Sequence, residues 1–425
     1  MSDHDPPAGD PDDPSSSDPS SNPFSGVPFM ADLFRAMGAA DQGGDPGRQI
    51  AMSVASGDQS EPNVDPIERI EWERLVRVAE LQVADRTGLD VARGHALTIE
   101  PVTRAVWASR SFDALSLLLG RLTETLNEGP AFDDVPEGLE DDPTAAWMKG
   151  LLASIGPLMA GLMSGTLVGR LAARSLGTYD LPIPRSDDSL LVVAPNVADF
   201  GNDWNLPADD LRLWVCLHEA LHHAVLGLPH VRSALTDLLT RHAGAFRNDP
   251  APLRDLMDDL DLAPLRELMG GLDPMAEPEA LMQLQQVMAE LQQVMSPDLV
   301  LGAVRSPEQE ALLPRIEALV AVVIGYADHF MDDIGGRLIG NYPMLTEALR
   351  RRRVQTDEAD RFIERILGLN LTQDQVERGT AFVAGVVDRA GDDGLRQLWS
   401  DERHLPTPNE VDAPGLWLAR TEMVD

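Results

Sequence analysis

Leu211-Arg-Leu-Trp-Val-Cys-Leu-His-Glu-Ala-Leu-His-His223 is the stretch that decides the fold and the chemistry of this chain. It lies within a predicted helix of about twenty residues, an ordinary length for a globular protein. Pro207 suits the first position of that helix, and Asp209 and Asp210 place carboxylates in its electropositive first turn. Gly227 marks its end. Both ends of the helix are therefore specified locally.

Two histidines of this helix are spaced as metal ligands. His218 and His222 are four residues apart, so their imidazoles project from one face and can take two corners of a tetrahedral zinc site. Glu219 lies next to the first of them, where it can accept a proton from a metal-bound water. The pattern His-Glu-x-x-His predicts a zinc hydrolase with Glu219 as its catalytic base. The alternative is a half-buried helix whose histidines pair with carboxylates or carbonyls.

Several stretches resemble one family, the zincin-like zinc-dependent metalloproteases of the HExxH type, which are found mainly in actinobacteria. The resemblance rests on Arg212–Val215, His218–His223, Leu176–Ile183 and Val192–Asn196, and also on Asn22–Phe29, Ala105–Trp107 and Leu405–Thr407. It covers most of the chain. It implies a zincin-like fold that is mainly α with a small β-sheet (α+β), a Zn2+ cofactor, and peptidase activity on a peptide or protein substrate.

Composition limits the partners and the compartment. The formal net charge of −36 over 425 residues argues against nucleic acid and against anionic membranes, because phosphates would be repelled. Cys216 is the only cysteine, which excludes an internal disulfide and is typical of a reducing compartment. No basic segment precedes an apolar one near the N-terminus, so we expect a cytoplasmic protein. The sequence does not indicate an oligomeric state.

The chain divides into an arm and one large domain. Residues 1–62 are rich in Asp, Pro, Ser and Gly, and we expect them to be mostly disordered, with a short docking segment near 23–37. Residues 63–425 are predicted to form a single catalytic domain. Within it, 249–300 is an acidic, Met- and Gln-rich stretch that we interpret as a helical insertion.

Three predicted helices precede the histidine helix. One helix is predicted from the spacing of six residues that share an apolar face, Ile67, Ile70, Leu75, Val78, Leu81 and Val83, and residues 101–126 predict a second helix. Residues 150–169 carry no charge, but their glycines, proline and hydroxyls argue against a membrane span. We expect these glycines to pack against the histidine helix.

One strand is clear, at Ser189-Leu-Leu-Val-Val-Ala194. Two uses of this strand remain open. In zincin-like folds a sheet edge near the metal-binding helix can hold an extended peptide by main-chain hydrogen bonds, and this strand is a candidate for that role. It is equally consistent with an ordinary core strand.

The third metal ligand is the weakest part of the zinc prediction. Ser306 and Gln309 predict a capping box that starts a helix running to Met331. Proteins of the resembling family usually carry a Glu in this helix immediately before a Gly, but Ile324 precedes Gly325 here. Asp328, one turn later, is the favoured replacement if the helix is shifted by part of a turn.

Other residues are candidates for the third ligand, for stabilising an oxyanion and for binding a substrate carboxylate. Glu317, His329 and His230 are weaker candidates for the third ligand, and Tyr326 or His223 could stabilise an oxyanion. The block Arg350–Arg353 is interpreted as a helix C-terminus, with a clamp for a substrate carboxylate as the sharper alternative.

The leading hypothesis is thus a zinc peptidase with His218, His222 and Asp328 as ligands and Glu219 as base. Its alternative is a catalytically impaired zincin-like protein that serves as a binding or scaffold module, because Ile324 replaces the carboxylate. A third hypothesis is a structural zinc closed by His223 or Cys216, although Cys216 faces elsewhere on the helix.

Overall fold

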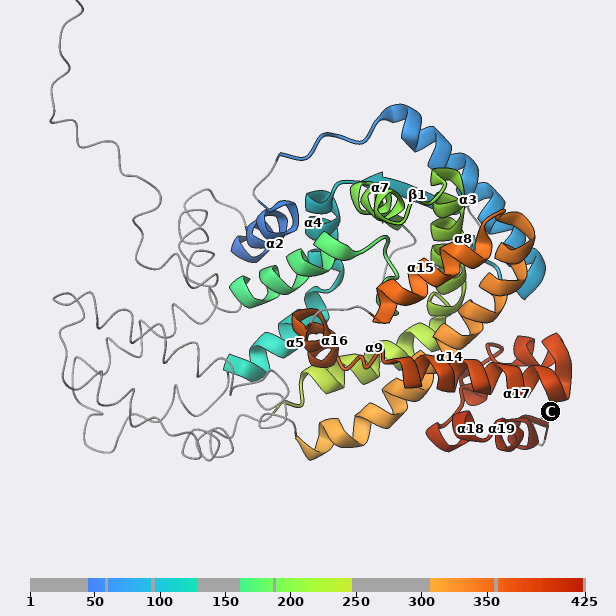
Figure 1. Cartoon of the computed structure of the whole chain (residues 1–425). Coiled ribbons are helices and arrows are strands. Elements are labelled where there is room, and N and C mark those ends of the chain that lie inside the picture. The colour runs from blue at the N-terminus through green and yellow to red at the C-terminus, as the bar shows by residue number, and fades with distance from the viewer. Residues whose placement is uncertain are drawn as a thin grey trace, which may run out of the picture.

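The computed structural model describes residues 45–57, 60–92, 96–127, 161–185, 189–246, 306–354 and 358–422. The expected docking segment at 23–37 and the insertion at 249–300 lie outside these residues. The first half contains α2 (Pro46–Ser56), α3 (Pro66–Thr87), β1 (Thr98–Val102), α4 (Arg104–Ala114), α5 (Ser116–Asn127), a helix ending at residue 174, β2 (Ser189–Val193), α7 (Ala194–Asp203), α8 (Ala208–Leu226) and α9 (Pro229–Ala243). The second half contains α14 (Pro307–Leu338), α15 (Tyr342–Val354), α16 (Glu358–Ile366), α17 (Gln373–Gln397), a 3-10 turn at Glu402–His404, α18 (Pro408–Asp412) and α19 (Pro414–Glu422). The predicted class, mainly α with a small β-sheet, is confirmed (Figure 1).

The sheet has two parallel strands, β1 and β2, aligned from Thr98 opposite Ser189 to Val102 opposite Val193. The second edge of β2 is also used, because Gly177 forms an antiparallel bridge to Val192 and the Val193 N–H donates to the Leu176 carbonyl at 2.9 Å. Four of the five β2 residues are buried. The core-strand interpretation therefore holds, and β2 offers no open edge to a bound peptide.

The histidine helix α8 ends before Gly227 as predicted and begins one residue later than predicted, because Pro207 is its N-cap and not its first helical residue. It packs against α3, α9 and α14 in the middle of the molecule (Figure 1). Leu217, Leu221 and Val225 are fully buried, so the apolar stripe of this helix belongs to the core. This packing fixes the orientation of the helix face that carries the histidines.

The long helix α14 crosses α17 at two glycines. The predicted capping box of Ser306 and Gln309 is present at the start of α14. A Cβ atom on Gly379 of α17 would lie 1.9 Å from the Ala321 carbonyl oxygen, and one on Gly325 would lie 2.4 Å from the backbone of Gly379. Such close backbone contact leaves α14 no freedom to rotate about its axis. The residues that α14 presents to α8 are therefore set by this crossing.

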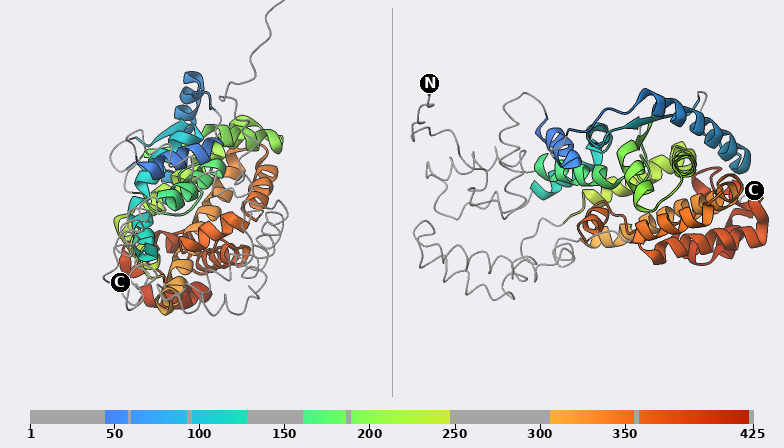
Figure 2. Two further views of the ribbon diagram at one scale, coloured as in Figure 1. Left: turned by 90° about the vertical axis from the view of Figure 1, so that its left-hand side faces the viewer. Right: turned by 45° about the horizontal axis from the view of Figure 1, so that its top comes forward.

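The glycines of the helix at 161–174 do not contact α8, so that prediction was wrong. Their partner is α2, which lies beside this helix in both figures of the whole chain (Figures 1 and 2). A Cβ on Gly165 would lie 2.4 Å from the Gly47 carbonyl oxygen, and one on Gly169 would lie 2.6 Å from Cβ of Val54. The helix α2 falls inside the arm that we expected to end at residue 62, because Ile50 and Ala51 have this packing surface to cover them.

Two further details differ from the sequence expectations. On the predicted apolar face of α3, Leu75 and Val83 are buried, but Ile67, Ile70 and Leu81 are 67%, 65% and 69% exposed. The buried face of α3 is centred on Trp72 and Val76, and α3 packs against α8. The expected helix at 101–126 is β1 followed by two helices. Within the described segments, no helix combines the length and apolarity that crossing a bilayer requires.

Candidate active site

A cavity of about 220 Å³ opens beside the histidine face of α8. Four segments form its walls in addition to α8: the loop after residue 174, α14, α15, and α16 with the loop that follows it. The residues that matter for chemistry are Tyr179 and Asp180 from the loop, His218 and His222 from α8, Ile324 from α14, and Arg352 and Arg353 from α15. Apolar side chains, among them Leu176, Leu181, Trp214 and Leu371, line most of the rest, together with Arg174 and its ion-pair partners Asp360 and Glu364.

The two candidate ligand histidines lie together in this cavity. Their ring centroids are 4.2 Å apart, and the His218 ring stacks on Trp214 at 4.9 Å. Nδ1 of His222 donates to the His218 carbonyl oxygen at 2.9 Å, so Nε2 of His222 is the unprotonated nitrogen in the neutral ring. Burial lowers the pKa of His218 to about 4 and that of His222 to about 3. Both rings are neutral at pH 7, the form that binds metals.

Glu219, the expected base, does not line the cavity. Its side chain is 1% exposed and accepts hydrogen bonds from the Thr178 N–H at 2.9 Å and the Tyr179 N–H at 3.1 Å. The adjoining residue is Gly177, where a Cβ atom would lie 2.4 Å from Glu219 Oε1. Burial, together with the charge of Asp180, raises the pKa of Glu219 to about 8. The carboxyl group therefore fastens α8 to the loop that carries Tyr179 and Asp180.

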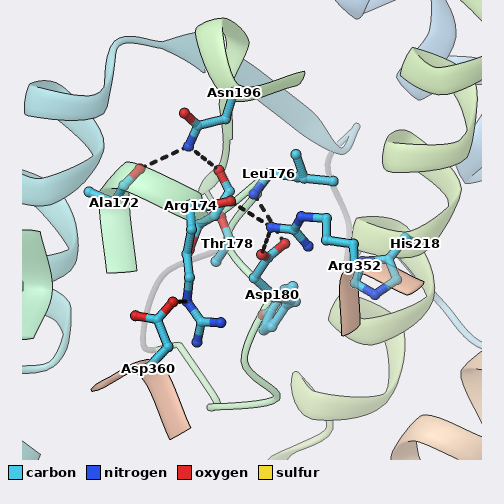
Figure 3. Close-up of polar contacts among 12 residues, drawn as sticks. Ala172, Arg174, Leu176, Thr178, Asp180, Asn196, His218, Arg352 and Asp360 are labelled. Atoms are coloured by element: carbon cyan, nitrogen blue, oxygen red, sulfur yellow. Dashed lines mark hydrogen bonds and ion pairs between the residues drawn. The ribbon is translucent and has the colours of Figure 1, made fainter. Parts of the chain in front are cut away.

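Asp180 is the carboxylate that lines the cavity from the loop. Its Oδ1 accepts from the Leu176 N–H at 3.1 Å, and its Oδ2 accepts from Arg352 at 2.6 Å (Figure 3). Arg352 also donates to the Arg174 carbonyl oxygen at 2.5 Å. Burial alone would raise the pKa of Asp180, but the Arg352 guanidinium outweighs it and the pKa is lowered. Asp180 is thus an ionised group whose two oxygens already have partners.

Asp328, the favoured third ligand, pairs with Arg353. The two side chains form a bidentate ion pair with nitrogen–oxygen distances of 3.0 and 3.2 Å. Burial would raise the pKa of Asp328, but the charge and hydrogen bonds of Arg353 have the larger combined effect, and the pKa is lowered. The α14 residue that lines the cavity is Ile324, one turn earlier and 6% exposed, whereas Asp328 is not among the lining residues.

The weaker candidates for the third ligand do not line the cavity either. Glu317 accepts a hydrogen bond from Asn370 at 3.1 Å. The His329 ring lies 3.8 Å from Asp392, and His230 is in the first turn of α9. His329 lines a separate cavity instead, together with Asp328 and Arg353.

The residues considered for the oxyanion and for a closed zinc site also point elsewhere. Tyr326 is 1% exposed and packs against Phe330 and Trp399. His223 faces Tyr179, whose hydroxyl lies 3.2 Å from its Nδ1. Cys216 is fully buried, and burial raises the pKa of its thiol. Tyr179 is the phenol that lines the cavity.

The donors that the structure brings together do not complete a three-ligand zinc site. Two neutral, neighbouring imidazoles suit zinc, but a catalytic site of this kind needs a third protein ligand. The carboxylates of Asp180, Asp328 and Glu219 are bound by Arg352, Arg353 and backbone N–H groups. Among the described residues, no group of three or more His, Cys, Asp and Glu side chains is arranged to hold a metal ion. The residues as placed do not fit the zinc centre.

The sequence reasoning missed the loop residues of this site. Tyr179 and Asp180 belong to the stretch Leu176–Ile183, which carried part of the family resemblance, but nothing local assigns them a role. Arg352 and Arg353 belong to the block interpreted as a helix C-terminus, and α15 does end there. Their partners 172 and 25 residues away in sequence are visible only in the fold.

Comparison with known proteins identifies the family of this chain. A model of the zincin-like metallopeptidase family matches residues 45–418. The chain belongs to this family. The crystal structure of a suspected hydrolase with a novel fold from Chloroflexus aurantiacus is similar, with 22% identity and a TM-score of 0.56 over 88% of this chain and 97% of that one. At this identity the likeness shows the fold alone. No curated protein matches the chain significantly.

Proposed function

We propose that this member of the zincin-like metallopeptidase family binds a peptide-like ligand in the histidine cavity without hydrolysing it. The observation that carries the proposal is that the carboxyl groups in and next to the histidine cavity already have partners: Asp180 binds Arg352, Asp328 binds Arg353, Glu219 binds backbone N–H groups, and Asp360 and Glu364 bind Arg174. A hydrolytic zinc site needs a third protein ligand besides the two histidines, and a group that takes the proton from the metal-bound water. In this chain these groups stabilise the walls of the cavity instead.

The lining of the cavity supports a ligand of mixed polarity. Leu176, Leu181 and Trp214 offer apolar surface, and the charged pair of Asp180 and Arg352 lies beside it. A peptide presents both kinds of group, with amide and carboxylate oxygens that arginine binds well. Family membership makes a peptide the first ligand class to test.

A zinc-dependent peptidase is the second candidate, and one observation favours it. The hydrogen bond from Nδ1 of His222 to a carbonyl is the usual arrangement behind a metal-binding imidazole. His218, His222 and Asp328 would hold the ion, and Glu219 would act as base. This function requires Asp328 to leave Arg353 and Glu219 to leave the N–H groups of its loop.

Peptide turnover separates the two functions. The full chain, supplied with one equivalent of zinc, is incubated with a tetrapeptide library, and products are detected by mass spectrometry. We expect no cleavage above the level of Glu219→Gln. Zinc-dependent cleavage that Glu219→Gln abolishes would defeat the proposal in favour of the peptidase.

Binding is measured with the same peptides by thermal shift. We expect a subset of them to raise the melting temperature of the natural chain. Ile324→Trp fills the cavity from the α14 wall and should remove this shift, whereas Leu416→Trp, at a position that is 58% exposed, should preserve it. If no peptide gives a shift that depends on position 324, the cavity is not a peptide site.

A further inference from the structure

The ion pair of Asp328 with Arg353 explains why Asp328 is not available as a third metal ligand. Both side chains are only 29% exposed, and the guanidinium meets both carboxylate oxygens. A carboxylate in such surroundings needs a cation, because an unpaired buried charge is strongly destabilising. A guanidinium and a bound metal ion can each meet this need.

The pair stands beside the two imidazoles. Arg353 lines the same cavity as His218 and His222. Asp328 follows Ile324 by one helical turn, so both residues project from nearly the same side of α14. The negative charge of Asp328 acts on both rings, where it opposes the larger effect of burial on the pKa of each. The carboxylate, the guanidinium and the imidazoles therefore form one electrostatic group.

Movement of α14 does not offer a way to present Asp328 to the histidines. The contact of Gly325 with Gly379 prevents rotation of the helix, which removes the shift by part of a turn that the sequence analysis required. What remains is a change of partner by the Asp328 side chain itself. That change is opposed by the two hydrogen bonds to Arg353.

We propose that Arg353 and a divalent cation compete for Asp328, and that Arg353 holds the carboxylate in the natural chain. The charge of Asp328 is then compensated by Arg353 without a metal ion, and the two imidazoles are the ligands left for zinc. The inference rests on the proposed function, for which it supplies the cause. Removing the guanidinium should turn His218, His222 and Asp328 into a three-donor site for zinc or a similar ion that accepts nitrogen and oxygen ligands.

The experiment compares zinc affinities in a competition assay with a fluorescent chelator. Arg353→Met retains much of the side chain's apolar length without its charge, and it should bind zinc at least about tenfold more tightly than the natural chain. The double variant Arg353→Met with Asp328→Asn should lose this gain. Arg351→Met, on the exposed side of the same helix, is the matched control and should bind zinc as the natural chain does.

A second readout is the melting temperature with and without zinc. Zinc should raise it in Arg353→Met more than in the double variant, since a ligand stabilises only the state that binds it. If Arg353→Met does not fold, Arg353→Lys replaces it, because a single ammonium cannot reproduce the two-point contact. Its zinc affinity should exceed that of the natural chain and fall again when Asp328→Asn is added.

Ile324→Glu is the positive control, because it adds a carboxylate directly to the cavity wall. If this variant gains zinc affinity and the Arg353 variants bind zinc no better than their Asp328→Asn counterparts, the competition does not exist. Peptide turnover by the natural chain is a separate result. It would overturn the proposed function, whereas equal zinc affinity of the Arg353 variants with and without Asp328 would overturn the competition.

Discussion

Two walls of the histidine cavity, one from α8 and one from α14 and α15, differ in the metal-binding groups that they present. The α8 wall presents two neutral imidazoles side by side, 4.2 Å apart between ring centroids. The opposite wall, from α14 and α15, presents Ile324 and a guanidinium that occupies Asp328. The α8 wall thus presents a pair of imidazoles, whereas the wall from α14 and α15 presents an aliphatic side chain and an ion pair.

The difference follows from how each wall is built. The imidazoles of α8 are brought together by a four-residue spacing within one helix, which needs no other element. The facing wall depends on the rotation of α14, on the α15 arginines and on the glycine crossing with α17. We therefore expect substitutions in the wall from α14 and α15, and at the crossing with α17, to lower the stability of the fold even where they lie far from the histidines.

The largest effect is expected at the crossing of α14 and α17. Gly379→Ala forces a Cβ into the Ala321 carbonyl, at 1.9 Å in the present backbone, and should lower the free energy of unfolding by more than about 3 kcal/mol. Gly336→Ala is the control, because a Cβ there has nothing within 4 Å and removes a helix-weakening glycine. Urea denaturation measures both. Equal stabilities of the two variants would show that the crossing does not fix α14.

The next effect concerns pH and the buried carboxyl group of Glu219. Its pKa of about 8 lies above the ordinary glutamate value of 4.5, so the folded protein holds the proton more tightly than the unfolded chain. The stability from this proton is complete below the unfolded pKa and is lost as pH rises from 4.5 towards 8, with a slope of at most about 1.4 kcal/mol per pH unit. Glu219→Gln should flatten the curve of unfolding free energy over this range. A curve of the same slope in both proteins would contradict the assignment.

A smaller effect distinguishes two neighbouring arginines of α15. Arg352 binds Asp180 and the Arg174 carbonyl in the cavity wall with 27% of its side chain exposed, and Arg352→Ala should cost about 2 kcal/mol. Arg351 pairs with Glu347 at the surface, where the side chains are 57% and 55% exposed, so Arg351→Ala should cost less than about 0.5 kcal/mol. Thermal unfolding of both variants checks the ratio. Similar losses would mean that the cavity wall does not depend on Arg352.

The sequence predicts the parts of the molecule that local spacing controls. The limits of α8 to within one residue, the capping box at Ser306 and the strand β2 were all predicted, because caps and apolar patterns act within a few residues. The strand β1 was missed because Pro101 and its five-residue length leave a weak pattern.

Contacts between distant segments could not be predicted in the same way. The glycines of the helix at 161–174 signal a close approach but not their partner, which is α2. The spacing of Glu219 after His218 suggests a base, while its use is decided by the loop N–H groups of Thr178 and Tyr179, about 40 positions earlier in the chain. Asp328 and Arg353 likewise meet only because α14 and α15 fold back on each other.

The most direct test of the account is the zinc content of the purified natural chain after dialysis against a metal buffer. With two imidazoles and no available carboxylate, we expect the protein to retain less than about half an equivalent of zinc, and Arg353→Met to retain more. One full equivalent of tightly held zinc in the natural chain, lost in His218→Ala and in Asp328→Asn, would contradict the account.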